Sequence, residues 1–114
     1  MPKTHGLVLA LTRCNAAARA AEWNDWYDQE HLPRLVTVPG IVRARRYTAV
    51  GGSPQYLTAY ELTDRDAFES PEGLQARKTP WTAKMRSLFQ NTRRSMCRLI
   101  LPGITHDQAP GNQA

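Results

Sequence analysis

The order in which strand-like and helix-like segments follow one another is the feature that most limits how this chain can fold. An apolar, β-compatible segment lies at 5–12, the last strand is expected at 91–103, and the region 41–62 reads as a β-hairpin. Helix signals fill the two intervals between them, 13–35 and 64–90. The resulting order is β-α-β-β-α-β. It predicts an α+β fold of the ferredoxin-like type, with helices on one face of a four-stranded antiparallel sheet.

Polar residues and prolines punctuate these segments. Asn15 is the expected N-cap of the first helix, and Pro33 is expected to limit how far that helix continues. Pro71 and Pro80 interrupt the second helical interval, which predicts separate helical pieces. The turn of the hairpin is expected at 51–54, where the sequence is Gly-Gly-Ser-Pro.

The length of 114 residues fits a single domain, which we expect to span 1–104 and to be followed by a mobile polar tail at 105–114. The second face of the sheet needs a cover, and the sequence offers no third layer. We therefore predict a homodimer that packs sheet face to sheet face, because an exposed apolar face favours aggregation.

The charge pattern excludes several partners. The net charge is +5, but the arginines are scattered and no run of five basic residues occurs. We therefore expect no nucleic-acid partner, and interpret the charge as solubility or affinity for an anionic ligand. No apolar stretch approaches the length of a membrane span, so no membrane partner is expected either.

The two cysteines, Cys14 and Cys97, form no CxxC motif and have no histidine at metal-ligand spacing. We predict them to be small core residues in the thiol state, which fits a cytoplasmic location. The N-terminal segment is interpreted as a first strand and not as a secretion signal. Since GxSxG, Walker, GxGxxG and HExxH motifs are missing from the sequence, no metal and no organic cofactor is expected.

Residues 22–35, EWNDWYDQEHLPRL, hold an unusual density of functional side chains. At about 100° per residue, Trp23, Asn24, Tyr27 and His31 fall on one helical stripe, which we expect to face the sheet; Trp26 falls on a neighbouring face. Inward polar groups need partners, and a small-molecule cavity would supply them.

The strands are expected to complete this cavity. His5 and Leu9 share one parity on the first strand, Tyr60 stands on the third, and Ile41 shares a face with Tyr47 on the second. We predict a catalytic role for His31 as general acid or base, and for Tyr27 and Asn24 as hydrogen-bonding partners of a developing oxyanion. The predicted substrate-binding residues are His5, Leu9, Trp23, Tyr47, Tyr60 and Trp81.

The same residues also fit a simpler interpretation. Aromatic stripes at helical spacing usually belong to a core, and a single inward histidine is usually structural. Trp81 either caps a pocket or anchors the second helix. Arg43, Arg45 and Arg46 either bind a carboxylate or phenolate, or only keep an edge strand soluble.

Four segments resemble the EthD-like group of dimeric α+β barrel proteins: EWNDWYDQEHLP, VPGIVRARRY, YLTAYEL, and TPWT with the later NTRR. The resemblance covers roughly 5–100. It implies a ferredoxin-like protomer, a dimer through the sheets and a cavity between sheet and helices. Members include polyketide cyclases, muconolactone isomerases and cofactor-free monooxygenases. In cyclase-type members a histidine on the first strand and a tyrosine on the first helix line the cavity, as His5 and Tyr27 would. The further histidine that those cyclases carry after the third strand has no counterpart in DRDAFESPEG.

Three functions follow as hypotheses. The first is a cofactor-free enzyme that isomerises, cyclises or eliminates an aromatic, polyketide-like or lactone substrate by proton transfer. The second is a cofactor-free monooxygenase of phenolic substrates. The third is a non-catalytic ligand-binding or accessory protein of a pathway.

Overall fold

A computed structural model of the chain describes residues 6–51, 55–100 and 103–108. Its strands form one antiparallel sheet in the order β2-β3-β1-β4, which is the ferredoxin-like arrangement. The predicted fold class is confirmed. The strands are β1 (Gly6–Cys14), β2 (Ile41–Thr48), β3 (Tyr56–Leu62) and β4 (Phe89–Arg98).

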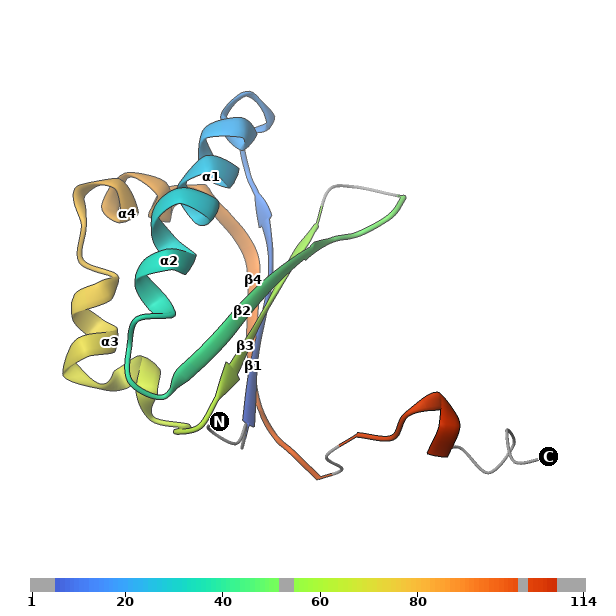
Figure 1. The fold of residues 1–114 in the computed structure, drawn as a ribbon. Helices are drawn as coiled ribbons and strands as arrows, with labels where there is room; N and C mark the ends of the chain where they lie inside the picture. The colour runs from blue at the N-terminus through green and yellow to red at the C-terminus, as the bar shows by residue number, and fades with distance from the viewer. Residues whose placement is uncertain (1–5, 52–54, 101–102, 109–114) are drawn as a thin grey trace.

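Helices α1 to α4 all lie on one side of the sheet, and the last short helix stands away from this body (Figure 1). The segment after β1 is a nearly continuous helix that passes from η1 through α1 and a π-helical turn into α2. The helical elements are η1 (Ala17–Arg19), α1 (Ala20–Trp26), the π turn η2 (Tyr27–His31), α2 (Leu32–Leu35), η3 (Ala67–Glu69), α3 (Pro71–Ala76), α4 (Pro80–Met85), η4 (Arg86–Leu88) and η5 (His106–Gln108).

The helix ends differ from the sequence expectations at several points. Asn15 does not cap the first helix; its side chain donates to the Ser87 carbonyl at 2.7 Å. Pro33 does not end that helix, because it lies in the first turn of α2, where proline is tolerated. Pro71 and Pro80 begin α3 and α4, and the second helical interval is divided into separate pieces, as predicted.

Strand register decides which side chains face the helices. Ala10 pairs with Thr58 and with Arg94, and paired residues share a face of the sheet. Since Thr58 is buried, all three lie on the helix-covered face. Leu9 therefore points to the open face, because neighbours along a strand alternate. This placement corrects the expectation that Leu9 faces the first helix. His5, which was expected on the same face as Leu9, lies outside the described residues.

A β-bulge corrects the expected faces of β2. Ile41 opposes Leu62 whereas Arg43 opposes Glu61, so Val42 is an extra residue in the ladder. Ile41 is buried with Leu62 on the helix-covered face, and the residues after the bulge are shifted by one. Tyr47 pairs with Leu57, so it lies on the open face and is half exposed.

The core has two parts, which meet above the middle of the sheet. The first, at the end of the sheet near α2 and α3, includes Val8, Leu35, Tyr60, Leu62 and Phe68. The second, beneath α1 and α4, consists of Trp23, Trp26, Tyr27, Met85 and Leu88. Together these side chains anchor the helices to one face of the sheet.

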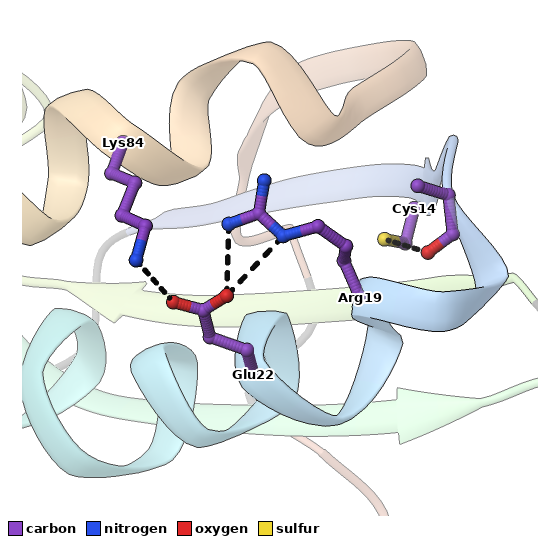
Figure 2. A network of polar contacts seen from close by, with 5 residues as sticks. Cys14, Arg19, Glu22 and Lys84 are labelled. Atoms are coloured by element: carbon purple, nitrogen blue, oxygen red, sulfur yellow. Dashed lines mark hydrogen bonds and ion pairs between the residues drawn. The ribbon is translucent and has the colours of Figure 1, made fainter.

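An ion network on the surface joins helix α1 to helix α4 (Figure 2). The Glu22 carboxylate accepts from Arg19 Nη2 at 2.8 Å and pairs with Lys84 Nζ at 3.0 Å. The hydrogen bond from Arg19, followed by that from Lys84, lowers the pKa of Glu22 below its ordinary value. The contact links two helices that both contribute to the cavity described next.

Candidate functional site

A cavity of about 320 Å³ lies where the two parts of the core meet, between the helices and the sheet. That volume is at the lower end of the range for small-molecule sites. The described residues that line it come from every layer of the fold. They are Ala10, Trp26, Tyr27, His31, Leu35, Tyr60, Phe68, Arg77, Thr82, Arg86, Phe89, Thr92 and Arg94.

The π turn places two of these rings against each other. The backbone N–H of Leu32 donates to the carbonyl of Tyr27, five residues earlier, which is the hydrogen bond of a π helix. Residues five apart are then about one turn apart. The rings of Trp26 and His31 consequently stack, with centroids 4.3 Å apart and planes inclined by 23°.

The indole of Trp26 is held from its other side by polar contacts. Its Nε1–H donates to Glu30 Oε2 and to Thr82 Oγ1, both at 3.2 Å. The hydroxyl of Thr79 contacts the same two groups, at 2.7 Å and 2.9 Å. Trp26 is 1% exposed, so this network fixes the ring against which His31 packs.

His31 is neutral in this environment. Burial, and then the positive charges of Arg77, Arg46 and Arg94, lower the pKa of its imidazole from 6.5 to about 3. Its Nδ1 is buried and has no hydrogen-bond partner among the described residues. A buried polar side chain without a partner in a cavity wall is a mark of a binding site.

Two phenols in the cavity stay protonated. Burial raises the pKa of Tyr27 to about 12, against the lowering effect of the Arg46 charge. Burial also raises the pKa of Tyr60 far above its ordinary range. Both hydroxyls are therefore hydrogen-bond donors at neutral pH.

Arginines give the cavity a positive potential. Arg77, Arg86 and Arg94 line it, and none of the described lining residues is acidic. Burial, and then the neighbouring Arg94 charge, lower the pKa of Arg77, although a guanidinium remains protonated. The site therefore favours a neutral or negatively charged ligand over a cation.

Three of the nine predicted site residues line the cavity together: His31, Tyr27 and Tyr60. Trp23 is fully buried in the core beneath α1, and Trp81 packs at the edge of the same cluster. Tyr47 and Leu9 lie on the open sheet face. These four residues therefore do not line the cavity, contrary to the expectation that they bind the substrate.

Asn24 is the fifth described site residue that lies outside the cavity wall, and it serves a structural pairing. Its Oδ1 accepts from Arg46 Nη2 at 2.7 Å, and its Nδ2 donates to the carbonyl of Ala20 at 2.9 Å. Arg46 also pairs with Asp28 at 2.9 Å and stacks on Tyr27, its Cζ 4.2 Å from the ring centroid. Asn24 thus meets the sheet through Arg46 and does not line the cavity.

The sequence interpretation missed several wall residues, among them Trp26, Phe68, Thr82 and Arg94. Trp26 was placed on a neighbouring helix face because an ordinary helical period was assumed. Arg94 stands beside Arg93 in the sequence, and only the register with β1 shows which of the two faces the helices.

A larger but shallower groove of about 940 Å³ runs between α2 and α3. Its described lining includes Gln29, Pro33, Arg34 and Pro71, with no aromatic or histidine side chain. We place the candidate site in the smaller cavity, because it alone of the two contains the neutral histidine and the aromatic walls.

Within the described ranges, no group of three or more His, Cys, Asp or Glu side chains is arranged to hold a metal ion. None of the helices in those ranges has the length and apolar character needed to cross a bilayer.

The sequence matches no protein-family model, and a search of curated proteins gives no significant match. Solved structures do resemble the fold. A variant of SnoaB, described as a cofactor-independent oxygenase from Streptomyces nogalater, is 20% identical with a TM-score of 0.65; the match covers 89% of this chain and 100% of that one.

Two further structures are similar. A monooxygenase from the gene ActVA-Orf6 of Streptomyces coelicolor, in complex with nanaomycin D, has a TM-score of 0.66 at 14% identity, covering 90% of this chain and 96% of that one. A dimeric ferredoxin-like protein from an uncultured marine organism has a TM-score of 0.69 at 9% identity, covering 91% and 95%. At these identities the comparisons establish the ferredoxin-like α+β fold. The resemblance to EthD-like proteins in particular stays a prediction.

Proposed function

We propose that this protein is a cofactor-independent oxygenase that takes a phenolic aromatic substrate, bound as its anion, into the cavity between helices and sheet. The observation that carries the proposal is the composition of that cavity. Aromatic walls surround a neutral histidine, and arginines stand at the rim without an acidic neighbour among the described lining residues. The names of the SnoaB and ActVA-Orf6 structures support oxygen chemistry as the reaction class.

The walls would bind the ring system and the polar groups its oxygen. Trp26 and Phe89 offer flat apolar surfaces, and the protonated hydroxyls of Tyr27 and Tyr60 can donate to a phenolate oxygen. The surrounding arginine charges favour the anion over the neutral phenol. Because these groups are already in place, they lose little freedom when the substrate anion binds.

The substrate itself supplies the electrons. An anthrone can lose a proton to water and become an enolate. The enolate transfers electrons to O₂, and a carbon–oxygen bond forms at the electron-rich carbon of the enolate. The peroxide then takes up a proton. Loss of water breaks the O–O bond and removes the remaining hydrogen of that carbon as a proton. One anthrone and one O₂ give one quinone and one water, so no further reductant is needed.

We assign His31 a role as a hydrogen-bonding partner of the substrate, and not as the base that removes a proton from it. An imidazole with a pKa of about 3 is a weak base toward a phenol, whose own pKa is near 10. The imidazole can still exchange a hydrogen bond with the substrate oxygen or with the peroxide. The neutral ring also leaves the wall uncharged where O₂, an apolar molecule, must enter.

A second candidate, acid–base isomerisation or cyclisation, is favoured by one observation. Nδ1 of His31 has no hydrogen-bond partner among the described residues, so the imidazole has an unmet hydrogen-bonding group in the cavity wall. An anion bound beside it would raise the pKa of its imidazole and make it a better proton carrier. This reaction would proceed without O₂, which separates it from the first candidate.

We also propose that two copies associate through their open sheet faces. Leucines at positions 7, 9 and 11 of β1 and at 57 of β3 share that face. None of the helices α1 to α4 covers it (Figure 1). A partner copy would bury these side chains, and the similar marine structure is described as dimeric.

Oxygen uptake tests the proposed function directly. Purified protein and 1,8-dihydroxyanthrone are mixed in an oxygen electrode, and the quinone is followed by absorbance and by incorporation of ¹⁸O₂. We expect one O₂ consumed per quinone, with one labelled atom in the product. Uptake no faster than the uncatalysed oxidation would contradict the proposal. Turnover of a lactone or polyketide-like substrate without O₂ would favour the second candidate instead.

A matched pair of variants places the reaction in the cavity. Tyr60→Phe removes one hydroxyl from the cavity wall, whereas Tyr47→Phe removes one from the open sheet face. We expect Tyr60→Phe to lower kcat/KM for the anthrone about tenfold, and Tyr47→Phe to leave it unchanged. Equal effects of the two substitutions would remove the reaction from this cavity.

A further inference from the structure

Two guanidinium groups from distant parts of the chain meet at the ring of Phe68. Arg77 follows helix α3, and Arg94 belongs to strand β4. Their Cζ atoms lie 5.8 Å and 5.0 Å from the centroid of that ring. Both arginines line the cavity, so two positive charges face the same end of it.

The protein positions one of these two groups firmly. Arg77 Nη2 donates to the carbonyl of Phe68 at 2.7 Å, and its Nε donates to the carbonyl of Gly73 at 3.3 Å. Its side chain is 23% exposed. These carbonyl contacts orient the guanidinium but leave its charge without a close counterion.

The positive charges lack compensation on the protein side. The acid that pairs with Arg77, Glu69, lies 3.9 Å away and is 70% exposed. The Arg94 side chain is exposed, and its guanidinium makes no hydrogen bond or ion pair with any described residue. Like charges held near one another repel, and an anion between them removes the repulsion.

We propose that Arg77 and Arg94 form a carboxylate subsite at the rim of the cavity, so that the preferred ligand is an aromatic acid. The inference rests on the proposed function only in that both use the same cavity. The ring system of the ligand would lie among Trp26, Tyr60 and Phe89, and its carboxylate would reach the two guanidinium groups beside Phe68.

The chemistry of the rim favours a carboxylate over a phosphate. A guanidinium fork matches the two oxygens of a planar carboxylate. Phosphate sites typically add a cradle of backbone N–H groups from a glycine-rich loop or a helix N-terminus. None of the described lining residues is a glycine, so the rim lacks that cradle.

Ligand binding measured without O₂ tests the subsite separately from any reaction. The probes are anthraquinone-2-carboxylate and anthraquinone-2-carboxamide, titrated by calorimetry at low and at high NaCl, with inorganic phosphate as competitor. We expect the acid to bind about tenfold more tightly than the amide. Added NaCl should weaken only the acid. Millimolar phosphate should not displace the acid; displacement would overturn the choice of carboxylate.

Substitutions of single arginines test which side chain causes the preference for the acid over the amide. Arg94→Ala should remove most of the preference for the acid and leave amide binding unchanged, which also shows that the cavity is intact. Arg94→Lys keeps the charge but not the fork, and an intermediate preference is expected. Arg65→Ala makes the same change of net charge at an 83% exposed side chain outside the cavity, and should alter neither affinity.

Equal affinities for acid and amide, or equal losses in Arg94→Ala and Arg65→Ala, would overturn the subsite. These outcomes are independent of the oxygenase proposal, because the anthrone used to test that proposal carries no carboxylate. Oxygen uptake without acid preference would retain the oxygenase and reject the subsite. A preference for the acid that depends on Arg94, without oxygen uptake, would retain the subsite and reject the oxygenase.

Discussion

The rings of Trp26 and His31 stack at 4.3 Å although five positions separate the two residues along one helix. In a regular α-helix, side chains five residues apart point about 140° away from each other. The π turn from Tyr27 to His31 removes most of that angle. One extra residue in a helical turn thus brings the neutral histidine and the indole to the same cavity wall.

Loss of the indole N–H should weaken this wall. Trp26→Phe retains an aromatic ring but leaves Glu30 and Thr82 without their shared donor. We expect a decrease in the free energy of unfolding of about 1–3 kcal/mol, measured by urea denaturation at neutral pH. Trp81→Phe, outside the cavity wall, is the control and should have a smaller effect. Unchanged stability of Trp26→Phe would show that the network does not hold the ring.

The buried imidazole should make stability depend on pH. The pKa of His31 is about 3 in the folded protein and 6.5 when exposed in the unfolded chain. Above pH 6.5 neither state binds the proton, and the stability is at its full value. As the pH falls from 6.5 toward 3, only the unfolded chain takes up the proton. Stability should then be lost by at most about 1.4 kcal/mol per pH unit.

Comparison with His31→Gln isolates this contribution, since all other titrations are common to both proteins. The difference in unfolding free energy between wild type and variant, from urea melts between pH 7.5 and pH 4.5, should fall as the solution becomes more acidic. Parallel pH profiles of the two proteins would mean that the imidazole is solvated or already charged in the folded state.

Arg46 should contribute to stability more than its neighbours on β2. Its guanidinium pairs with Asn24 and Asp28 and covers the ring of Tyr27. Since its side chain is only 14% exposed, we expect Arg46→Ala to cost about 2–4 kcal/mol of unfolding free energy.

The control for that measurement is Arg43→Ala. Arg43 pairs with Glu61 at 3.3 Å, but its side chain is 51% exposed, so a loss of about 0–1 kcal/mol is expected. The free energy of unfolding of both variants is to be measured by urea denaturation at the same protein concentration. Similar losses in the two would show that Arg46 acts only as a surface charge.

The fold could be predicted from the sequence because each of its segments carries its own signal. Apolar strands, helix-forming intervals and turn residues follow in an order that few topologies accommodate. The residues at which helices begin and end could be predicted less precisely. Pro71 and Pro80 correctly predicted separate helical pieces, but the residues that cap α3 and α4, Ser70 and Thr79, were not identified from the sequence.

The site was only partly predictable, for two physical reasons. A period of 3.6 residues placed His31 and Tyr27 on the inner stripe but put Trp26 beside it, and the π turn that corrects this has no clear sequence signature. The continuous apolar run of β1 looks the same in either parity, so Leu9 was assigned to the wrong face. Arg94 and Arg93 differ only in the side of the sheet that register gives them.

The leucines of the open sheet face should govern self-association. Leu9→Arg places a charge in the middle of that face, opposite Ala59 and Ser95. We expect wild-type protein to sediment as a dimer and the variant to sediment mostly as a monomer, because an unpaired charge is costly in an apolar interface. Leu74→Arg, on α3 and 42% exposed, is the control. A dimer that survives Leu9→Arg would place the contact elsewhere.

A crystal structure with 1,8-dihydroxyanthraquinone bound, the product expected from the anthrone, tests the central claim most directly. The proposed function predicts the rings of the ligand in the cavity between Trp26, Tyr60 and Phe89, with a phenolic oxygen within hydrogen-bonding distance of the His31 imidazole. The ligand in the groove between α2 and α3, or a cavity closed by its own side chains, would contradict it.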